Sequence, residues 1–483
     1  MRAGLAREPD RVVSRHAPGG APGCPGSGHP SARWTAGEVL SLAAGLGEEF
    51  GRWEAGVGEP VPVLAGAGGL AQVAFLAGAL TSRPMAPVGT RLTTRELEDV
   101  VAPLPGTLLL AERRFEEPGR ALAERTARRL HFLDDVVPSA HPLPEHPPAS
   151  GPVALLHTSG TTGRPKPVPV HDRTLLRRSA VMAGVFGLER SSRFAATAPL
   201  HHVAGYGMLT AAMAVGAEVV AFDRFSAEAW QELGAMGVTH VSTVSAMIET
   251  LVEQGRLAIP GLQALSYGGS RIRTETLRQA LQMLPSTRFV ALYGQTEGSP
   301  ISFLSDEDHR VDRPELLRTA GRPVPGVDIV IDAPDDRGIG EIVAAGEHFF
   351  LVDADGQRRT GDMGSFRDGV LTVHGRSGDM LICGGENLYP VEVESVLARH
   401  PAVEEAVVVG VPDGRLGQVP VAYLRLRSGV VRPSAVELRD FARRDLAGFK
   451  VPRRWHVVDE FPRNAAGKVL RQRLDPAAPS LRN

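Results

Sequence analysis

Hydrophobic and polar positions along the chain predict short strands that alternate with helices. Runs rich in β-branched and aromatic residues stand at 153–157, 218–222, 240–244 and 288–292, and helical patterns such as 274–284 lie between them. Helix starts are expected where capping-box spacing occurs, at Thr35 with Glu38, Thr93 with Glu96 and Ser434 with Glu437. Strands that alternate with helices indicate βαβ units, so the predicted fold class is α/β with mostly parallel sheets.

The pattern changes after about residue 365. A glycine-rich segment, 374–386, precedes a compact α+β pattern with a helix near 390–399, strands at 403–411 and 419–427, and a helix at 434–446. We therefore expect a large N-terminal domain over 1–375 and a small α+β C-terminal domain over 376–483. The Pro/His-rich segment 138–152 is expected to be a loop.

One uncharged stretch could in principle span a membrane. Residues 60–80 contain no charge over 21 positions, which is nearly long enough to cross a bilayer. Pro60 and Pro62 precede a Gly-Ala-Gly-Gly break at 66–69, which favours a short buried strand and then a helix from about Leu70. No membrane span is expected, and the first thirty residues contain no apolar run typical of a secretory signal.

Composition narrows the class of protein further. The formal net charge of −2 and the absence of basic blocks give no reason to expect nucleic acid as a partner. The two cysteines, Cys24 and Cys383, cannot form a disulfide framework and fit a reduced cytoplasmic location. Only three of the 53 basic residues are lysines: Lys166, Lys450 and Lys468. Since arginine serves for ordinary charge here, each lysine is a candidate for a site that needs a compact ammonium.

The strongest local motif is LLHTSGTTGRPKPV at 155–168, where a strand leads into Ser, Thr and Gly residues and then Lys166. Backbone N–H groups and hydroxyls in such a turn can surround phosphate oxygens, and glycine permits close approach. The spacing is not that of a Walker loop. A solvated Ser/Thr/Gly linker is the alternative, although it would not need a lysine.

This motif resembles the phosphate-binding signature of the adenylate-forming superfamily, which includes acyl- and aryl-CoA ligases, luciferases and peptide-synthetase adenylation domains. Further motifs follow in the family's order: SYGGS at 266–270, LYGQTEG at 292–298, RTGD at 359–362, GRSGDMLICGGENLYPVEVE at 375–394 and PRNAAGKVLR at 462–471. The resemblance covers roughly residues 150–471 and is looser before them. It implies ATP and Mg²⁺ as cofactors and a C-terminal domain that rotates between two half-reactions.

The resemblance also implies roles for individual residues. Lys468 is the implied catalytic lysine, Thr296 contacts the α-phosphate and Glu297 holds Mg²⁺, while Asp362 holds the ribose hydroxyls with Arg376 beside it. The full set implied to bind the nucleotide is Thr158, Ser159, Gly160, Thr161, Thr162, Gly163, Lys166, Gly268, Gly269, Ser270, Tyr293, Gly294, Asp362 and Arg376. Adenylation brings two anions together, so this concentration of positive charge and donors suits the chemistry. The alternatives without a functional role are that Glu297 is a solvated residue at a helix start and that Asp362 is an ordinary aspartate in a turn.

Histidine at the acyl site gives a clue to the substrate. In APLHHVAGYG, His202 matches the family histidine that lies beside the acyl carboxylate, and a satisfied core histidine is the alternative. Peptide-synthetase domains carry an aspartate here to hold an amino group, and none stands between Ala195 and Ala217. The expected substrate is a hydrophobic, aromatic or fatty carboxylic acid.

The acceptor of the acyl group stays open at this point. CoA is expected first, because thioester formation is the family's commonest outcome. Several positions depart from the family pattern: Pro167 after Lys166, Gly378 at the expected pivot, and Leu416 and Val451 near the expected CoA site. An amine acceptor without CoA is therefore the close alternative, and a carrier protein is a third. A catalytically dead adenylate-binding protein is the rival from another class, and the oligomeric state is not predicted.

Overall fold

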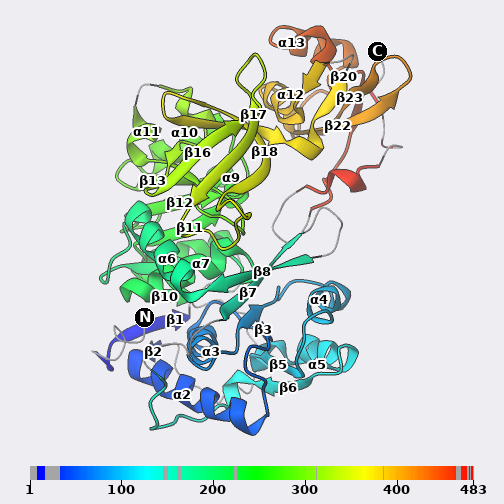
Figure 1. The fold of residues 1–483 in the computed structure, drawn as a ribbon. Coiled ribbons are helices and arrows are strands. Elements are labelled where there is room, and N and C mark those ends of the chain that lie inside the picture. The colour runs from blue at the N-terminus through cyan, green and yellow to red at the C-terminus, as the bar shows by residue number, and fades with distance from the viewer. Residues whose placement is uncertain are drawn as a thin grey trace. The chain divides into compact units, whose positions relative to one another are not determined.

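The structure is a computed structural model that describes residues 8–16, 33–144, 151–159, 165–221, 226–311, 313–383, 386–463, 469–475, 478 and 480–481. Contacts divide the chain into two compact units. The first contains Met1–Asp328 and Ala345–Arg358, and the second contains Ile329–Ala344 and Arg359–Asn483. Each unit is described by itself below (Figure 1).

A nine-stranded sheet forms the larger half of the first unit. Its strand order is β15-β14-β13-β12-β11-β9-β10-β1-β2, and the strands from β13 to β1 run parallel. The strands are β1 (Val12–His16), β2 (Arg33–Thr35), β9 (Arg193–Ala196), β10 (Glu218–Ala221), β11 (His240–Val244), β12 (Ala264–Gly268), β13 (Arg288–Tyr293), β14 (Ser302–Leu304) and β15 (Arg322–Pro323). Its helices are α6 (Asp172–Phe186), α7 (Val203–Val215), α8 (Ala227–Ala235), α9 (Ser245–Glu253), α10 (Thr274–Met283) and α11 (Asp306–Arg310).

A second sheet of six strands completes the first unit. Its order is β6-β5-β3-β4-β7-β8, parallel except for the β7–β8 pair. The strands are β3 (Val61–Leu64), β4 (Met85–Pro87), β5 (Leu108–Ala111), β6 (Arg129–Phe132), β7 (Pro152–Ser159) and β8 (Pro165–His171). Helices α2 (Ala36–Arg52), α3 (Gly69–Leu80), α4 (Thr94–Val101) and α5 (Glu116–Arg125) accompany them.

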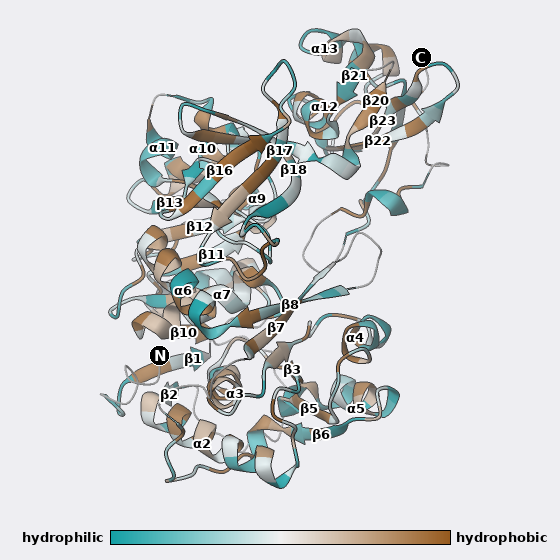
Figure 2. Ribbon diagram, in the orientation of Figure 1, coloured by the Kyte–Doolittle hydropathy of each residue, from teal (hydrophilic) through white to brown (hydrophobic). Residues whose placement is uncertain are grey.

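One hydrophobic core joins the two sheets. It includes Val63 of β3 and Leu156 of β7 together with Phe194 of β9 and Val219 of β10. Helix α3 lies in this core and buries nearly its whole surface, because its twelve residues carry no charge. Figure 2 shows the contrast between hydrophobic α3 and hydrophilic α11. The uncharged stretch at 60–80 is therefore a strand and a buried helix, as predicted, and none of the helices in the described ranges is long and apolar enough to cross a membrane.

The second unit contains two sheets. The four-stranded sheet has the order β16-β17-β18-β19, with β16 (Val327–Asp332), β17 (Gly340–Gly346), β18 (Arg358–Arg367) and β19 (Val370–Arg376). The five-stranded sheet contains β20 (Leu381–Cys383), β21 (Glu386–Leu388), β22 (Val403–Asp413), β23 (Gly417–Leu426) and β24 (Arg454–Val457), with helices α12 (Pro390–Leu397) and α13 (Ala435–Arg443). The expected domain boundary falls where β19 ends and a short 3₁₀ turn, Ser377–Asp379, begins; it stays a prediction.

The predicted α/β class with mostly parallel sheets is confirmed. The helix starts also agree: Thr35 and Thr93 form full capping boxes with Glu38 and Glu96. The Ser434 hydroxyl accepts a hydrogen bond from the N–H of Glu437 at 3.1 Å. Because each cap satisfies N–H groups that the helix itself leaves unpaired, these residues fix where the helices begin.

Candidate active site

Most of the predicted site residues of the first unit lie at one edge of the nine-stranded sheet. Strands β9, β11, β12 and β13 are parallel neighbours, so their carboxyl ends meet at the same edge. His202 follows β9, Gly268 ends β12 and Glu297 follows β13. Ligands of open α/β sheets bind at this edge, so the sheet assembles a candidate site from segments far apart in the sequence.

His202 begins helix α7 as its N-cap residue, with an extended backbone and no capping side chain. Its Nε2 atom is buried and has no hydrogen-bond partner among the described residues, and burial lowers its pKa. The ring centroid of His201 lies 4.0 Å away. Burial, with His202, Arg91 and His157, lowers the pKa of His201 to about 3, and burial lowers that of His157 to about 4. His201 and His157 are therefore neutral at pH 7 and add no positive charge beside His202.

The turn after β12 requires glycine at two positions. A Cβ on Gly268 would lie 2.6 Å from the carbonyl oxygen of Leu292 in β13, so only glycine permits this approach. Gly269 has a φ of +81°, in the left-handed region that favours glycine. The Ser245 hydroxyl donates to the carbonyl oxygen of Ser270 at 2.7 Å and ties the turn to α9. The predicted adenine-contacting turn is thus a narrow, fixed backbone.

The segment that contains Tyr293, Gly294, Thr296 and Glu297 is held by its backbone. The carbonyl oxygen of Glu297 accepts hydrogen bonds from the N–H groups of Phe350 at 2.7 Å and Leu351 at 3.0 Å. Thr296 is half-buried. The alternative of a solvated Glu297 at a helix start does not describe the structure, because no helix begins there and the side chain is 17% exposed.

Arg358 is a neighbour of the site that the sequence did not indicate. Its Nη2 lies 3.4 Å from Glu297 Oε1, and both side chains are mostly buried. Nothing in the spacing of QRRTGD distinguishes Arg358 from its exposed neighbour Arg359. The guanidinium adds positive charge beside the carboxylate that was expected to hold Mg²⁺.

The motif that was expected to bind phosphate includes parts of β7 and β8, which pair antiparallel. Strand β7 extends through Thr158 and Ser159, which pair with Lys166 and Pro165 of β8. Lys166 is exposed. Gly160, Thr161, Thr162 and Gly163, like the catalytic candidate Lys468, lie outside the described residues.

Asp362 and Arg376 face each other in the second unit. They are paired across β18 and β19, and Arg376 Nε donates to Asp362 Oδ1 at 3.1 Å. The side chain of Asp362 is 9% exposed, and its backbone N–H donates to the Thr360 hydroxyl at 3.0 Å. Asp362 is therefore a strand residue whose carboxylate is held by Arg376, and it does not lie in a turn.

The basic residues expected near CoA divide into two kinds. Lys450 is buried, with Nζ 2.5 Å from Glu392 Oε1 and 5.6 Å from the ring centroid of Phe449. Val451 is buried in the core of the C-terminal sheet. Arg453 is exposed. The structure thus gives Lys450 a partner within the protein, and Arg453 keeps a side chain directed to solvent.

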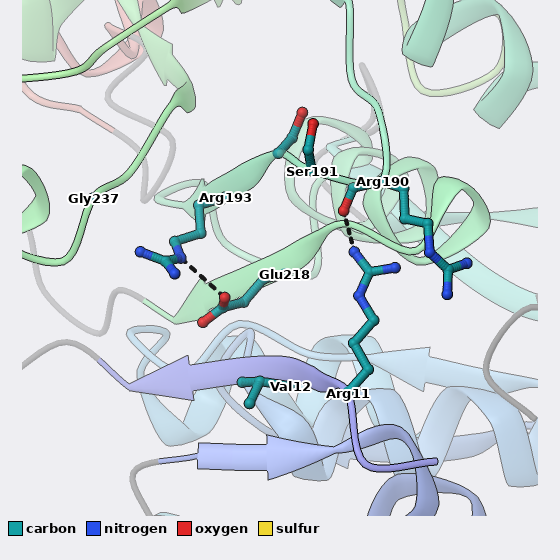
Figure 3. A pocket seen from close by; sticks show the side chains of 8 residues that line it. Arg11, Val12, Arg190, Ser191, Arg193, Glu218 and Gly237 are labelled. Carbon is teal, nitrogen blue, oxygen red and sulfur yellow. Dashed lines mark hydrogen bonds and ion pairs between the residues drawn. The ribbon is translucent and has the colours of Figure 1, made fainter. Parts of the chain in front are cut away.

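A separate hollow of about 420 Å³ lies at the opposite edge of the nine-stranded sheet. It is lined where β9 and β10 begin, by Arg193 and Glu218, and by Arg11 and Arg190 (Figure 3). Arg193 Nε donates to Glu218 at 2.9 Å, and Arg11 donates to the carbonyl oxygen of Arg190. Its charges are engaged within the protein and it lies away from the motif residues, so the carboxyl edge is the better candidate.

Comparison with known proteins identifies the family of this chain. Residues 6–351 match the family described as AMP-binding enzyme, and residues 392–468 match the AMP-binding enzyme C-terminal domain. The chain belongs to this family. The resemblance to adenylate-forming enzymes is confirmed, and the protein is an AMP-binding enzyme of the ligase type.

The relatives of this AMP-binding enzyme include several ligases. A fatty acid–[acyl-carrier-protein] ligase of Streptomyces coeruleorubidus is 32% identical and is covered over 81% of both chains. A 2-succinylbenzoate–CoA ligase of Bacillus licheniformis is 33% identical over 80% of this chain and 83% of that protein. The match to the Arabidopsis thaliana 2-succinylbenzoate–CoA ligase, 31% identical, spans 67% of this chain and 66% of that protein.

Two solved structures share the fold over nearly the whole chain. The o-succinylbenzoate CoA synthetase of Bacillus subtilis with its acyl-adenylate intermediate has a TM-score of 0.83 at 28% identity and covers 99% of this chain and 98% of that one. An amide bond synthetase of Marinactinospora thermotolerans has a TM-score of 0.83 at 24% identity, with 98% and 99% covered. The latter likeness supports the fold alone.

The side chains of this AMP-binding enzyme that could coordinate a metal suit Mg²⁺ better than a metal whose ligands all come from the protein. Among the described residues, no group of three or more His, Cys, Asp or Glu side chains could hold an ion. Mg²⁺ is usually held by one or two carboxylates together with substrate phosphates. Glu297 at the sheet edge can supply one such carboxylate, and its role as a Mg²⁺ ligand stays a prediction.

Proposed function

We propose that the protein activates a hydrophobic carboxylic acid, aromatic or fatty, with ATP and then passes the acyl group to an acceptor. A carboxylate oxygen attacks the α-phosphorus of ATP, the bond to pyrophosphate breaks, and an acyl-adenylate forms. The observation that carries this proposal is the cluster of His202, Gly268–Ser270 and Thr296–Glu297 at the carboxyl edge of one sheet. Mg²⁺, held by Glu297, supplies positive charge at the phosphates.

The candidate residues of the two units have distinct tasks in this reaction. The neutral His202 offers its unpartnered Nε2 to the carboxylate, and the turn at Gly268–Ser270 gives the adenine a close, flat backbone contact. Thr296 donates to the α-phosphate. Asp362 accepts from the ribose hydroxyls, and Arg376 fixes its orientation. Lys468 completes the charge that opposes the developing negative oxygen atoms.

CoA is the acceptor we favour. Its sulfur attacks the acyl carbon of the adenylate, AMP leaves, and the thiol proton is released. Arg453, exposed beside the C-terminal sheet, is available for a CoA phosphate. We place this step in a C-terminal domain over 376–483 that turns about Gly378, and the enzyme in the cytoplasm.

An amine acceptor is the second candidate. The observation that favours it is the ion pair of Lys450 with Glu392, which removes one cation from the expected CoA site. Val451, where relatives often have a basic residue, is an apolar residue buried in the core. An amine needs no phosphate-binding cations. Acid, ATP and amine would then give an amide and AMP with no thioester.

Exchange of labelled pyrophosphate into ATP tests the first half-reaction. Aromatic and fatty acids are screened one at a time with Mg²⁺, and Glu297→Gln serves as the inactive comparison. Acid-dependent exchange supports the proposal, and its absence with every acid would support a dead adenylate-binding protein. Mass spectrometry of a reaction that contains both CoA and amines then identifies the acceptor: thioester supports CoA, and amide alone refutes it.

A further inference from the structure

The hollow of about 420 Å³ in the first unit opens where strands β1, β9 and β10 begin, away from the candidate active site (Figure 3). Its volume falls within the range of small-molecule sites in proteins. Three guanidiniums, one carboxylate and two hydroxyls line it, from Arg11, Arg190, Arg193, Glu218, Ser191 and Ser192, and Val12 and Gly237 complete the lining. The hollow therefore offers a ligand charge and hydrogen bonds more than apolar surface.

The carboxylates at the hollow do not neutralise all of its guanidiniums. Glu218, the first residue of β10, forms ion pairs with both Arg193 of β9 and Arg15 of β1, so one carboxylate serves two cations. Arg11 donates to the backbone carbonyl oxygen of Arg190, and no carboxylate in the described part of the chain forms an ion pair with it. Positive charge is therefore in excess at Arg11.

Arg11 and Arg190 bring two of these guanidiniums to the same place. A Cβ on Gly216 would be 3.6 Å from Arg11 Nη1 and 3.8 Å from Arg190 Nη1, so both groups lie against one turn at the end of α7. Burial, and then the charge of Arg190, lower the pKa of Arg11. Arg190 pairs with Glu8, and both side chains are about half exposed. Because exposed pairs of this kind are weak, Arg190 can exchange Glu8 for another anion.

We propose that this hollow binds a phosphate group, held between the guanidiniums of Arg11 and Arg190 with the Ser191 hydroxyl at its side. Guanidiniums bind phosphate oxygens through charge-assisted hydrogen bonds that are frequently paired. A phosphate monoester carries about 1.5 to 2 negative charges at pH 7, which suits two guanidiniums that repel each other. Free phosphate, pyrophosphate and a phosphate ester of a small molecule share this chemistry. The site is separate from the one proposed for adenylation.

A structural role for the same arginines makes a different prediction. Helix α7 ends at Val215, and cations near the carboxyl end of a helix interact favourably with its dipole. If Arg11 and Arg190 served this end alone, they would stabilise the protein without any added anion. If they form a phosphate site, phosphate should raise the melting temperature, because a ligand that binds the folded state stabilises it.

The test uses the full chain with Mg²⁺ and an excess of a non-hydrolysable ATP analogue, which keeps the candidate active site occupied. Inorganic phosphate, pyrophosphate and ribose 5-phosphate are titrated separately. Ionic strength is held constant with sodium chloride, because salt screens exposed charges. Thermal shift and isothermal titration calorimetry then report binding, and a comparison of the three anions distinguishes a free anion from a phosphate ester.

Wild type should bind at least one of these anions saturably, with a matching rise in melting temperature. Arg11→Met and Arg190→Met should each weaken that binding by about tenfold or more, since each removes hydrogen bonds between charged groups. Arg11→Lys should fall between wild type and Arg11→Met, because it keeps the charge and loses the fork. If none of the three anions binds wild type saturably, the proposal is overturned.

Two further variants locate the bound anion even if Arg11→Met fails to fold. Ser191→Glu places a carboxylate in the hollow, so it should block phosphate binding and leave every guanidinium in place. Arg120→Met is the matched control, because Arg120 is an exposed arginine of α5 that pairs with Glu116 at 2.6 Å, and it should leave binding unchanged.

Unchanged phosphate affinity in Ser191→Glu would place the anion outside the hollow and overturn the proposal. A lower melting temperature of Arg11→Met without phosphate, together with no response of wild type to phosphate, would assign these arginines to the end of α7 and overturn it as well.

Discussion

Three buried histidines, His157, His201 and His202, make the first unit sensitive to acid. His157 lies in β7 with its Nδ1 atom buried and unpartnered, and burial lowers its pKa from 6.5 to about 4. A group with a lowered pKa in the folded state binds fewer protons there than in the unfolded chain. The folded state is therefore fully favoured above pH 6.5 and loses stability as the pH falls from 6.5 toward 4.

The size of this loss at pH 5 follows from the two pKa values. At pH 5 the unfolded histidine is protonated and the folded one is not, so the penalty is set by the 1.5 units between pH 5 and 6.5. Each unit corresponds to about 1.4 kcal/mol, which gives about 2 kcal/mol for His157. The result depends little on how far below 5 the folded pKa lies.

His157→Gln removes this titration. Urea unfolding is measured at pH 7 and at pH 5. Between these two pH values the free energy of unfolding should fall by about 2 kcal/mol less in the variant than in wild type. His171→Gln is the matched control, because the side chain of His171 is exposed. An equal pH 7 to pH 5 loss in His157→Gln and in wild type would refute the reasoning.

Three further predictions concern the two half-reactions. Lys468→Ala should slow adenylation about 10²–10³-fold and spare transfer from preformed acyl-adenylate; equal loss in both single-turnover assays would contradict its role. Gly378→Pro should fix φ near −65°, and so slow transfer while adenylation persists; failure of adenylation would show that the pivot lies elsewhere. Arg453→Ala should raise the KM for CoA severalfold without a change in pyrophosphate exchange, whereas Lys450→Met, which breaks the pair with Glu392, should lower the melting temperature and leave that KM unchanged.

Much of the fold followed from the sequence because its local signals agree with one another. The strand predicted at 240–244 coincides with β11, and the helix predicted at 274–284 with α10. Strand β8 was not predicted, since Pro165, Pro167 and Pro169 argue against a strand. It exists because β8 is at the edge of its sheet, where proline's missing N–H costs no ladder hydrogen bond.

The candidate site was predictable in its motifs and not in its supporting contacts. Gly268 and Gly269 were identified from the resemblance of SYGGS to the family's motif, and the structure shows why glycine stands at both positions. Arg358 and Glu297 are 61 residues apart in the sequence, so hydrophobic periodicity gives no information on their contact.

The single core shared by the two sheets has a consequence for any attempt to dissect the enzyme. Residues from β3 and β7 and residues from β9 and β10 belong to one hydrophobic cluster, with α3 inside it. A cut in the segment 138–151 would therefore divide the cluster itself and leave a wide apolar face on each fragment. Neither piece should fold alone; both should aggregate when expressed separately and regain structure only when refolded together.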